Sequence, residues 1–259
     1  MRYELEHRII PNKLYKYQPV NNYTLANLKN NQIWFSNVDD FNDPFELRFN
    51  IDKRSGNDIL NDSLKRHGIT APELSKEKSD NIEKAAEKTV EEFANNFKKY
   101  NGVSCFSELY DNILMWSHYA DKHSGFCLEF DTRYELFNKI RKVNYSDDYP
   151  KISLDISKVG DKFLDSICTK NKQWGYEKEW RLLHKECNKL YVYDNKCLTG
   201  IYFGAKMPFV YKEIISLIMR GQSRTVKFYE GFLSEKKYEL NFKQTEYTPY
   251  LERTDIKIV

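Results

Sequence analysis

The stretch VSCFSELYDNILMWSHYADKHSGFCLEFD, residues 103–131, decides the fold. Its two ends, residues 103–107 and 126–131, are short apolar or alternating runs that are typical of strands. Between them, residues 112–120 predict a helix, and Gly125 separates that helix from the second strand. The sequence therefore predicts a strand, a short helix and another strand in close succession.

Further strands and helices are predicted on both sides of this stretch. The expected helices cover residues 22–31 and 155–170. The expected strands cover residues 13–17, 33–36, 180–184, 200–204, 214–219, 226–230 and 238–243. Because strands and helices are interspersed without regular alternation, the sequence predicts an α+β fold with a split, mostly antiparallel central sheet.

Residues 52–100 differ in composition from the rest of the chain. They are strongly charged and almost free of Tyr and Trp, and Ile82, Ala86, Val90 and Phe97 fall on one helical face. We expect residues 52–100 to form a helical insertion within a single domain of residues 1–259.

Composition limits the classes of protein to consider. The 259 residues carry 41 Lys and Arg against 38 Asp and Glu, so the charge is nearly balanced and does not indicate a basic nucleic-acid-binding protein. No apolar run approaches the about 20 residues of a membrane-spanning helix, so no membrane partner is expected. The N-terminus, MRYELEHRII, lacks the apolar stretch of a secretory signal, and the five cysteines form no CxxC pair. These features predict a cytoplasmic protein with reduced cysteines.

Several common sites are not indicated. The ten glycines form no phosphate-binding loop. His118 and His123 are five residues apart, which does not place both on one helical face, and no third metal ligand is evident. Cys105 has no histidine near it in sequence, so the spacing does not predict a cysteine nucleophile.

Three segments concentrate side chains suited to a ligand site. Residues 41–46, FNDPFE, join carboxylates and an amide to a bend that Pro44 makes rigid, with Phe side chains as expected anchors. Residues 115–120, MWSHYA, offer flat stacking surfaces and hydroxyl groups. Residues 174–181, WGYEKEWR, place two glutamates at the start of a strand. Each segment also has a structural interpretation, as a turn seated on the core, as core packing, or as a charged strand face.

The two glutamates of the third segment are two residues apart. In a strand, Glu177 and Glu179 share a face and Lys178 points away. Arg181 lies on the same face and is placed to keep Glu179 ionised, or simply to pair with it.

The motifs resemble a bacterial family of unassigned activity, domain of unknown function family 2971. The resemblance extends over roughly residues 13–205 and is carried by residues 14–17, 34–36, 41–46, 104–107, 115–120, 125–130 and 174–181.

The order of these sequence segments along the chain is also similar to that in ADP-ribosyltransferases. This resemblance implies a sheet of that type, with Glu179 in the catalytic position and Glu177 before it. It implies NAD as the substrate, held by Tyr15, Lys16, Ser104, Ser107, Trp116 and Tyr119. The first strand departs from the pattern, because Lys16 stands where the family has Arg or His, and an ammonium cannot make the two-pronged contact of a guanidinium.

The resemblance implies an ADP-ribosyltransferase or NAD glycohydrolase that works without a metal. Glu179 would stabilise the ribosyl oxocarbenium ion that forms as nicotinamide leaves. The expected setting is a bacterial toxin or phage-defence effector, with a protein or nucleic-acid acceptor and an antitoxin or other operon partner.

Two other functions remain open from the sequence. One is a metal-dependent nuclease in which Asp43, Glu46, Glu177 and Glu179 surround a divalent ion. The other is a non-catalytic binding or sensor module in which the same carboxylates are structural.

Overall fold

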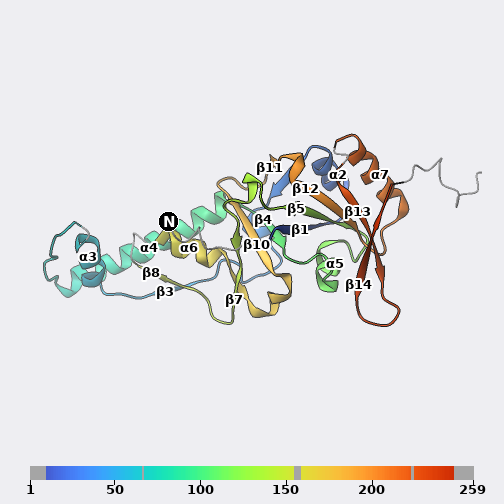
Figure 1. The fold of residues 1–259 in the computed structure, drawn as a ribbon. Helices are drawn as coiled ribbons and strands as arrows, with labels where there is room; N and C mark the ends of the chain where they lie inside the picture. Colours follow the sequence, from blue (N-terminus) through green and yellow to red (C-terminus); the bar gives the residue numbers. More distant parts are fainter. Residues whose placement is uncertain (1–9, 66, 155–158, 223–224, 248–259) are drawn as a thin grey trace, which may run out of the picture.

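An eight-stranded sheet forms the centre of the computed structural model, which describes residues 10–65, 67–154, 159–222 and 225–247 (Figure 1). The strand order is β14-β13-β12-β5-β1-β4-β10-β6, and the pairs are antiparallel except for β12 with β13. The α+β class with a large, mostly antiparallel sheet is thus confirmed. The strands are β1 (Lys13–Gln18), β4 (Gly102–Ser107), β5 (Phe126–Asp131), β6 (Arg141–Lys142), β10 (Glu179–His184), β12 (Leu198–Phe203), β13 (Lys227–Leu233) and β14 (Leu240–Thr245).

The sheet is weakly joined at its middle. β1 is paired with β5 over all six of its residues, whereas the register between β1 and β4 holds the single pair Tyr15 with Ser107. Beyond that pair, the Lys16 ammonium donates hydrogen bonds to Ser104 Oγ at 2.9 Å and to the Cys105 carbonyl at 3.1 Å. A side chain therefore spans the gap that main-chain hydrogen bonds would otherwise close.

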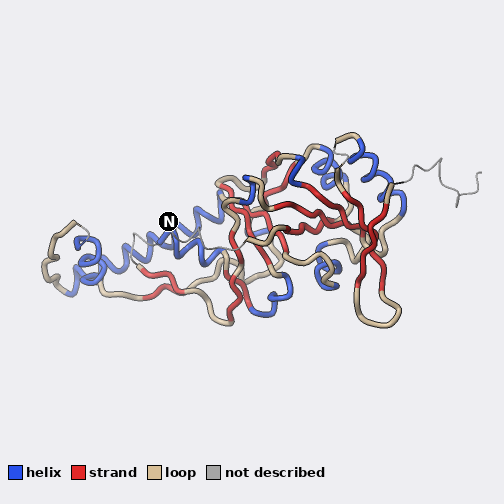
Figure 2. Tube along the Cα trace, viewed as in Figure 1, coloured by secondary structure: helices blue, strands red, loops and turns tan. Residues whose placement is uncertain are grey.

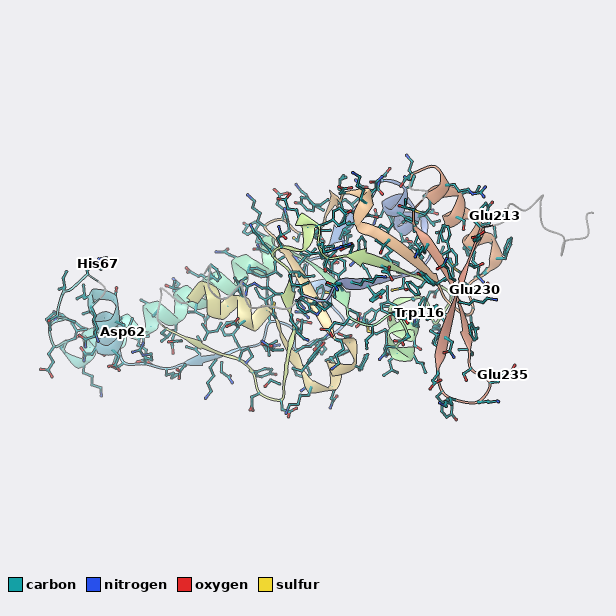
Figure 3. The ribbon with its side chains drawn as sticks, in the orientation of Figure 1. Asp62, His67, Trp116, Glu213, Glu230 and Glu235 are labelled. Carbon is teal, nitrogen blue, oxygen red and sulfur yellow. The ribbon has the colours of Figure 1, made fainter. Side chains whose placement is uncertain are left out.

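Different elements cover the two faces of the sheet (Figure 2). One face packs against α2 (Asn22–Lys29), α7 (Phe209–Arg220) and the β2–β11 pair (Gln32–Phe35 with Lys189–Val192) around the largest apolar core. The other face packs against α5 (Ile113–Tyr119), where Trp116 is completely buried in the body of the molecule (Figure 3). The candidate site lies on this second face.

The insertion forms an arm that extends from the sheet (Figure 1). It consists of α3 (Gly56–Lys65) and the long α4 (Lys76–Tyr100), with β3 (Asn50–Asp52), β8 (Lys151–Ser153) and α6 (Val159–Ile167) alongside. Asp62 and His67 mark its outer end in Figure 3. Its apolar core extends onto the sheet at Val103 of β4, and the buried Phe163 ring lies 5.1–6.1 Å from the rings of Phe49, Phe93 and Phe97.

Short elements complete the described chain. They are η1 (Val38–Asp40), η2 (Glu135–Phe137), β7 (Asn144–Ser146), β9 (Thr169–Asn171), η3 (Lys172–Glu177) and η4 (Asn195–Cys197). Within the described ranges, no helix is long and apolar enough to cross a membrane.

The strand predicted over residues 214–219 is wrong, because these residues lie in helix α7. Ile215 and Met219, four residues apart, are buried, whereas Leu217 between them is 53 % exposed. This is helical periodicity, which a window of six residues, five of them apolar, is too short to reveal. The helix predicted over residues 155–170 is α6, and residues 155–158 lie outside the described chain.

Replacing Phe163 by Ala is expected to lower the free energy of unfolding by about 3–5 kcal/mol, because it opens a cavity beneath α4. Phe232→Ala is the matched control, since that ring is 49 % exposed and its loss is expected to cost less than about 1 kcal/mol. Urea unfolding of both variants measures the difference. Equal losses would contradict the assignment of a packed core to the arm.

Candidate functional site

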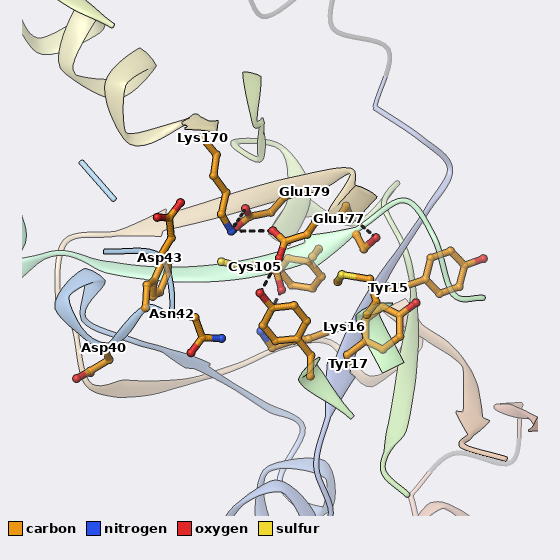
Figure 4. A pocket seen from close by; sticks show the side chains of 15 residues that line it. Tyr15, Lys16, Tyr17, Asp40, Asn42, Asp43, Cys105, Lys170, Glu177 and Glu179 are labelled. Carbon is orange, nitrogen blue, oxygen red and sulfur yellow. Dashed lines mark hydrogen bonds and ion pairs between the residues drawn. The ribbon is translucent and has the colours of Figure 1, made fainter. Parts of the chain in front are cut away.

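A pocket lies where β1 and β4 part, on the face covered by α5 (Figure 4). Its volume is about 230 Å³. It is lined by Tyr15, Lys16, Tyr17, Asp40, Phe41, Asn42, Asp43, Cys105, Phe106, Ser107, Met115, Tyr119, Lys170, Glu177 and Glu179.

A completely buried arginine lies behind the pocket. Arg181 donates two hydrogen bonds to Glu46, at 2.8 and 2.6 Å, and two to Glu179, at 2.8 and 3.0 Å. Its Nη1 also donates to the Ile167 carbonyl at 2.5 Å. Because paired hydrogen bonds between a guanidinium and a carboxylate fix the angle as well as the distance, Glu179 is held in one orientation.

A lysine and a tyrosine hold the second glutamate. The Lys170 ammonium lies 2.7 Å from Glu177 Oε2 and 3.5 Å from Glu179 Oε2, so it bridges the two carboxylates (Figure 4). The Tyr119 hydroxyl donates to Glu177 Oε1 at 2.6 Å, and the Lys170 ammonium lies 4.5 Å from the centre of the Trp174 ring. Both oxygens of Glu177 therefore have a partner.

The same environment moves the pKa values of the two glutamates in opposite directions. Burial opposes ionisation of Glu179, but Arg181 and Lys170 outweigh it and lower the pKa to about 2. Burial raises the pKa of Glu177, and the charge on Glu179 adds to this, while Lys170 and Tyr119 offset only part of it. The site thus combines a carboxylate that is ionised at neutral pH with one that takes up a proton more readily.

Lys16 and Cys105 also line the pocket, and burial moves the pKa of each. Burial lowers the pKa of Lys16, which receives two hydrogen-bond acceptors but no carboxylate within ion-pair distance among the described residues. Burial also raises the pKa of the Cys105 thiol, which keeps it protonated and disfavours its use as a nucleophile.

Local backbone contacts set the start of β10. Glu177 ends the 3₁₀ helix η3, and Lys178 adopts a left-handed conformation with φ of 46°, so the expectation that both glutamates lie in one strand is wrong. The Ser107 hydroxyl donates to the Glu177 carbonyl at 2.6 Å, and the Glu179 amide donates to the Tyr145 hydroxyl at 2.8 Å. The two side chains still converge, because Lys170 lies between them.

The turn over residues 41–46 connects to the site through its last residue. Asp43 Oδ1 accepts a hydrogen bond from the Phe45 amide at 2.9 Å, as in an Asx turn, and Glu46 reaches Arg181. The Phe41 ring centre is 5.5 Å from the Arg181 guanidinium. Phe45 is 58 % exposed, so the expectation that both Phe side chains anchor the turn holds for Phe41 alone.

The structure brings together most of the residues expected at the site. Two of them do not line the pocket. Ser104 is buried and accepts from Lys16, and Trp116 is completely buried, with its Nε1 donating to the Tyr110 carbonyl at 2.7 Å. The hypothesis that Trp116 stacks on a ligand is therefore corrected to a core role. The residues that do line it are Tyr15, Lys16, Ser107, Tyr119, Glu177 and Glu179.

Sequence reasoning missed Lys170. This lysine is buried, which is unusual, yet nothing in the surrounding TKN sequence distinguishes it from a surface lysine. Lys170 lies seven residues before Glu177 in the sequence, and the two side chains meet because the 3₁₀ helix η3 folds the chain back between them.

Three of the four carboxylates proposed for a nuclease are arranged around protein cations, and the fourth, Asp43, accepts a hydrogen bond from the Phe45 amide. Glu46 and Glu179 accept hydrogen bonds from Arg181, and Glu177 accepts one from Lys170. Among the residues that the structure describes, no group of three His, Cys, Asp or Glu side chains is placed to hold a metal ion. A divalent ion would have to displace these ammonium and guanidinium groups.

Residues 115–182 match a family of unknown function. Its description is "Protein of unknown function (DUF2971)". The matched range contains Tyr119, Lys170, Glu177 and Glu179, which confirms the resemblance to this family over the part of the chain that carries the two glutamates. No curated protein and no solved structure matches the chain.

The low pKa of Glu179 is expected to make stability depend on pH. Its folded value of about 2 lies below the ordinary 4.5, so the carboxylate contributes stability above about pH 4.5 that is lost as the pH falls toward 2. The difference corresponds to about 3 kcal/mol. Between pH 6 and pH 3, the free energy of unfolding is expected to fall more steeply for the wild type than for Glu179→Gln, which cannot titrate there.

Glu235→Gln is the matched control for this pH experiment. Glu235 lies in the exposed loop between β13 and β14, so its variant is expected to keep the wild-type pH dependence (Figure 3). Urea titrations at each pH supply the free energies. The same pH dependence in Glu179→Gln as in the wild type would show that Arg181 does not hold Glu179 ionised.

Proposed function

We propose that the protein cleaves the bond between nicotinamide and ribose in NAD and passes ADP-ribose to a macromolecular acceptor or to water. One observation carries the proposal: a buried carboxylate, oriented by Arg181 and kept ionised, faces a pocket at the split of an antiparallel sheet. As part of this proposal, we assign the central sheet to the ADP-ribosyltransferase-like type.

Glu179 supplies the electrostatic part of the reaction. When nicotinamide leaves, positive charge develops on the ribose, and a fixed negative charge lowers the energy of that transition state. A pKa of about 2 means that this charge is present at neutral pH without reorganisation. Glu46, through Arg181, is a positioning residue for the same carboxylate.

Glu177 is suited to proton transfer. Its raised pKa makes it a better base than Glu179, and Lys170 and Tyr119 hold it beside the pocket. In this mechanism Glu177 accepts the proton of the acceptor's incoming hydroxyl as the new bond to ribose forms.

The pocket fits the nicotinamide–ribose part of the substrate. Tyr17, Phe41, Met115 and Tyr119 give it flat and apolar surfaces for a planar ring. Two of the three N–H donors of Lys16 bind Ser104 Oγ and the Cys105 carbonyl, and the third is left for a substrate hydroxyl. The setting as a bacterial toxin or defence effector with an operon partner is supported by the resemblance to ADP-ribosyltransferases alone, whereas the cytoplasmic location is proposed from the cysteine pattern and the N-terminal sequence.

Glu179→Gln is expected to slow nicotinamide release from NAD by about 10²–10³-fold, because it removes the charge that stabilises the transition state. Glu179→Asp keeps the charge but shortens the side chain by one methylene, so a large loss in the rate of nicotinamide release is expected here too. Glu235→Gln, exposed and outside the pocket, is expected to retain the wild-type rate.

Folding must be checked in parallel, because Glu179 is only 4 % exposed and its replacement leaves Arg181 with fewer partners. Circular dichroism identifies a temperature at which all three variants are folded, and rates are compared there. If folded Glu179→Gln releases nicotinamide as fast as the wild type, Glu179 is not the catalytic carboxylate. If neither the wild type nor any variant releases nicotinamide from NAD, the results favour a binding or sensor module.

Glu177→Gln is expected to reduce transfer to an acceptor more than it reduces hydrolysis of NAD. The amide keeps the shape and the contact to Tyr119 but cannot accept the acceptor's proton. The measurement is the ratio of ADP-ribose transferred to nicotinamide released, with Tyr119→Phe as a control that removes only the hydroxyl contact. An unchanged ratio in Glu177→Gln would exclude Glu177 as the base for the acceptor.

A further inference from the structure

The charges around the pocket favour a cationic ligand. Its lining contains four carboxylates, on Asp40, Asp43, Glu177 and Glu179, and two ammonium groups, on Lys16 and Lys170. Arg181 behind the pocket is matched by Glu46. Even with a proton on Glu177, the lining carries more negative than positive charge.

Both ammonium groups have partners in the protein, and Lys16 keeps one N–H donor, which is an isolated point charge and not a fork. Lys170 lies 2.7 Å from Glu177 and 3.5 Å from Glu179, and Lys16 donates to Ser104 and to the Cys105 carbonyl. No arginine is among the described residues that line the pocket. A pyrophosphate is normally bound by a guanidinium fork or by a row of backbone amides at a helix N-terminus, so the clamp for that group is missing here.

The adjoining hollow does not supply this clamp. It shares Lys170 with the pocket and is lined by Arg48, but also by Asp147 and Asp148, so its charge is balanced. The pocket itself, at about 230 Å³, is below the about 300–1,000 Å³ of sites that enclose a drug-sized ligand. Its size suits a nucleoside rather than a dinucleotide.

We infer that the pocket recognises its substrate through the ribosyl-pyridinium cation alone, so that a phosphate-free N-riboside of nicotinamide is a substrate in its own right. This inference rests on the proposed cleavage of NAD. With nicotinamide riboside and water, the C1′–N bond breaks and its electron pair goes to the ring nitrogen, which becomes neutral. A C1′–O bond forms with water, a proton is released, and the products are nicotinamide and ribose.

The charge at the pocket rim is expected to discriminate between the substrates. Nicotinamide riboside carries one positive charge, whereas NAD carries a net negative charge. Asp40 lines the pocket and is exposed, so Asp40→Asn is expected to lower kcat/KM for the riboside and to raise it for NAD, each by about two- to threefold. Asp39→Asn is the matched control, because Asp39 is equally exposed and adjacent but does not line the pocket.

The experiment measures nicotinamide release by the full chain from nicotinamide riboside and from NAD. We expect kcat/KM for the riboside to lie within about tenfold of that for NAD, because the described lining of the pocket has no arginine to bind the phosphates and use their binding energy in the transition state. Raising the salt concentration from about 0.05 to 0.5 M should reproduce the opposite shifts of Asp40→Asn, since ions screen the same charges.

Three results would overturn the inference. A kcat/KM for NAD more than tenfold above that for the riboside would show that the phosphates are bound, and NAD cleavage would stand. Equal effects of Asp40→Asn on both substrates would remove the electrostatic argument. Release of nicotinamide from neither substrate would refute the proposed function, and the inference with it.

Discussion

The buried guanidinium of Arg181 is the interaction on which the rest of the structure depends. Removing an isolated cation from water costs several kcal/mol, and here two carboxylates and one carbonyl offset that cost. The three partners come from distant parts of the chain: Glu46 precedes β3 of the arm, Ile167 ends α6 of the arm, and Glu179 begins β10 of the sheet. Arg181 therefore ties the arm to the sheet at the same point where it orients Glu179. The arm must therefore dock on the sheet for Glu179 to take up its orientation in the site.

The candidate site lies where a general rule of sheet structure is broken. Adjacent strands normally pair along their length, yet β1 and β4 share one residue pair and a lysine side chain spans the gap. The half-buried Lys16 ammonium has no carboxylate within ion-pair distance in the described part of the chain, and its pKa is lowered, so it adds nothing to stability that an apolar side chain could not supply. Local departures of this kind concentrate at functional positions, which is an argument for function that is independent of any resemblance.

The sequence predicted the elements that have a clear period or clear ends. Residues 13–17, 103–107 and 126–131 are strands, as predicted from short runs in which apolar and aromatic residues are mixed or alternate with polar ones. It failed at α7, where helical spacing was hidden in an apolar run, and at Lys178, whose left-handed backbone depends on contacts made by its neighbours. The glutamates of the site could be named from their spacing. Lys170 and the core role of Trp116 could not, because burial is decided by tertiary packing.

The two glutamates differ because of their partners and not because of their position in the sequence. Lys170 contacts both, but Glu179 has a guanidinium as its second partner and Glu177 has a neutral tyrosine hydroxyl. Together with Glu46, the cluster holds three carboxylates and two cations, so it carries one excess negative charge when every group is ionised. Burial disfavours that excess charge, and Glu177, whose pKa is raised, is the member of the cluster that takes up a proton first as the pH falls. The same packing that fixes a charge on Glu179 thus makes Glu177 the more basic of the two carboxylates. A pair of carboxylates whose environments separate their pKa values is the arrangement from which enzymes assign acid and base roles.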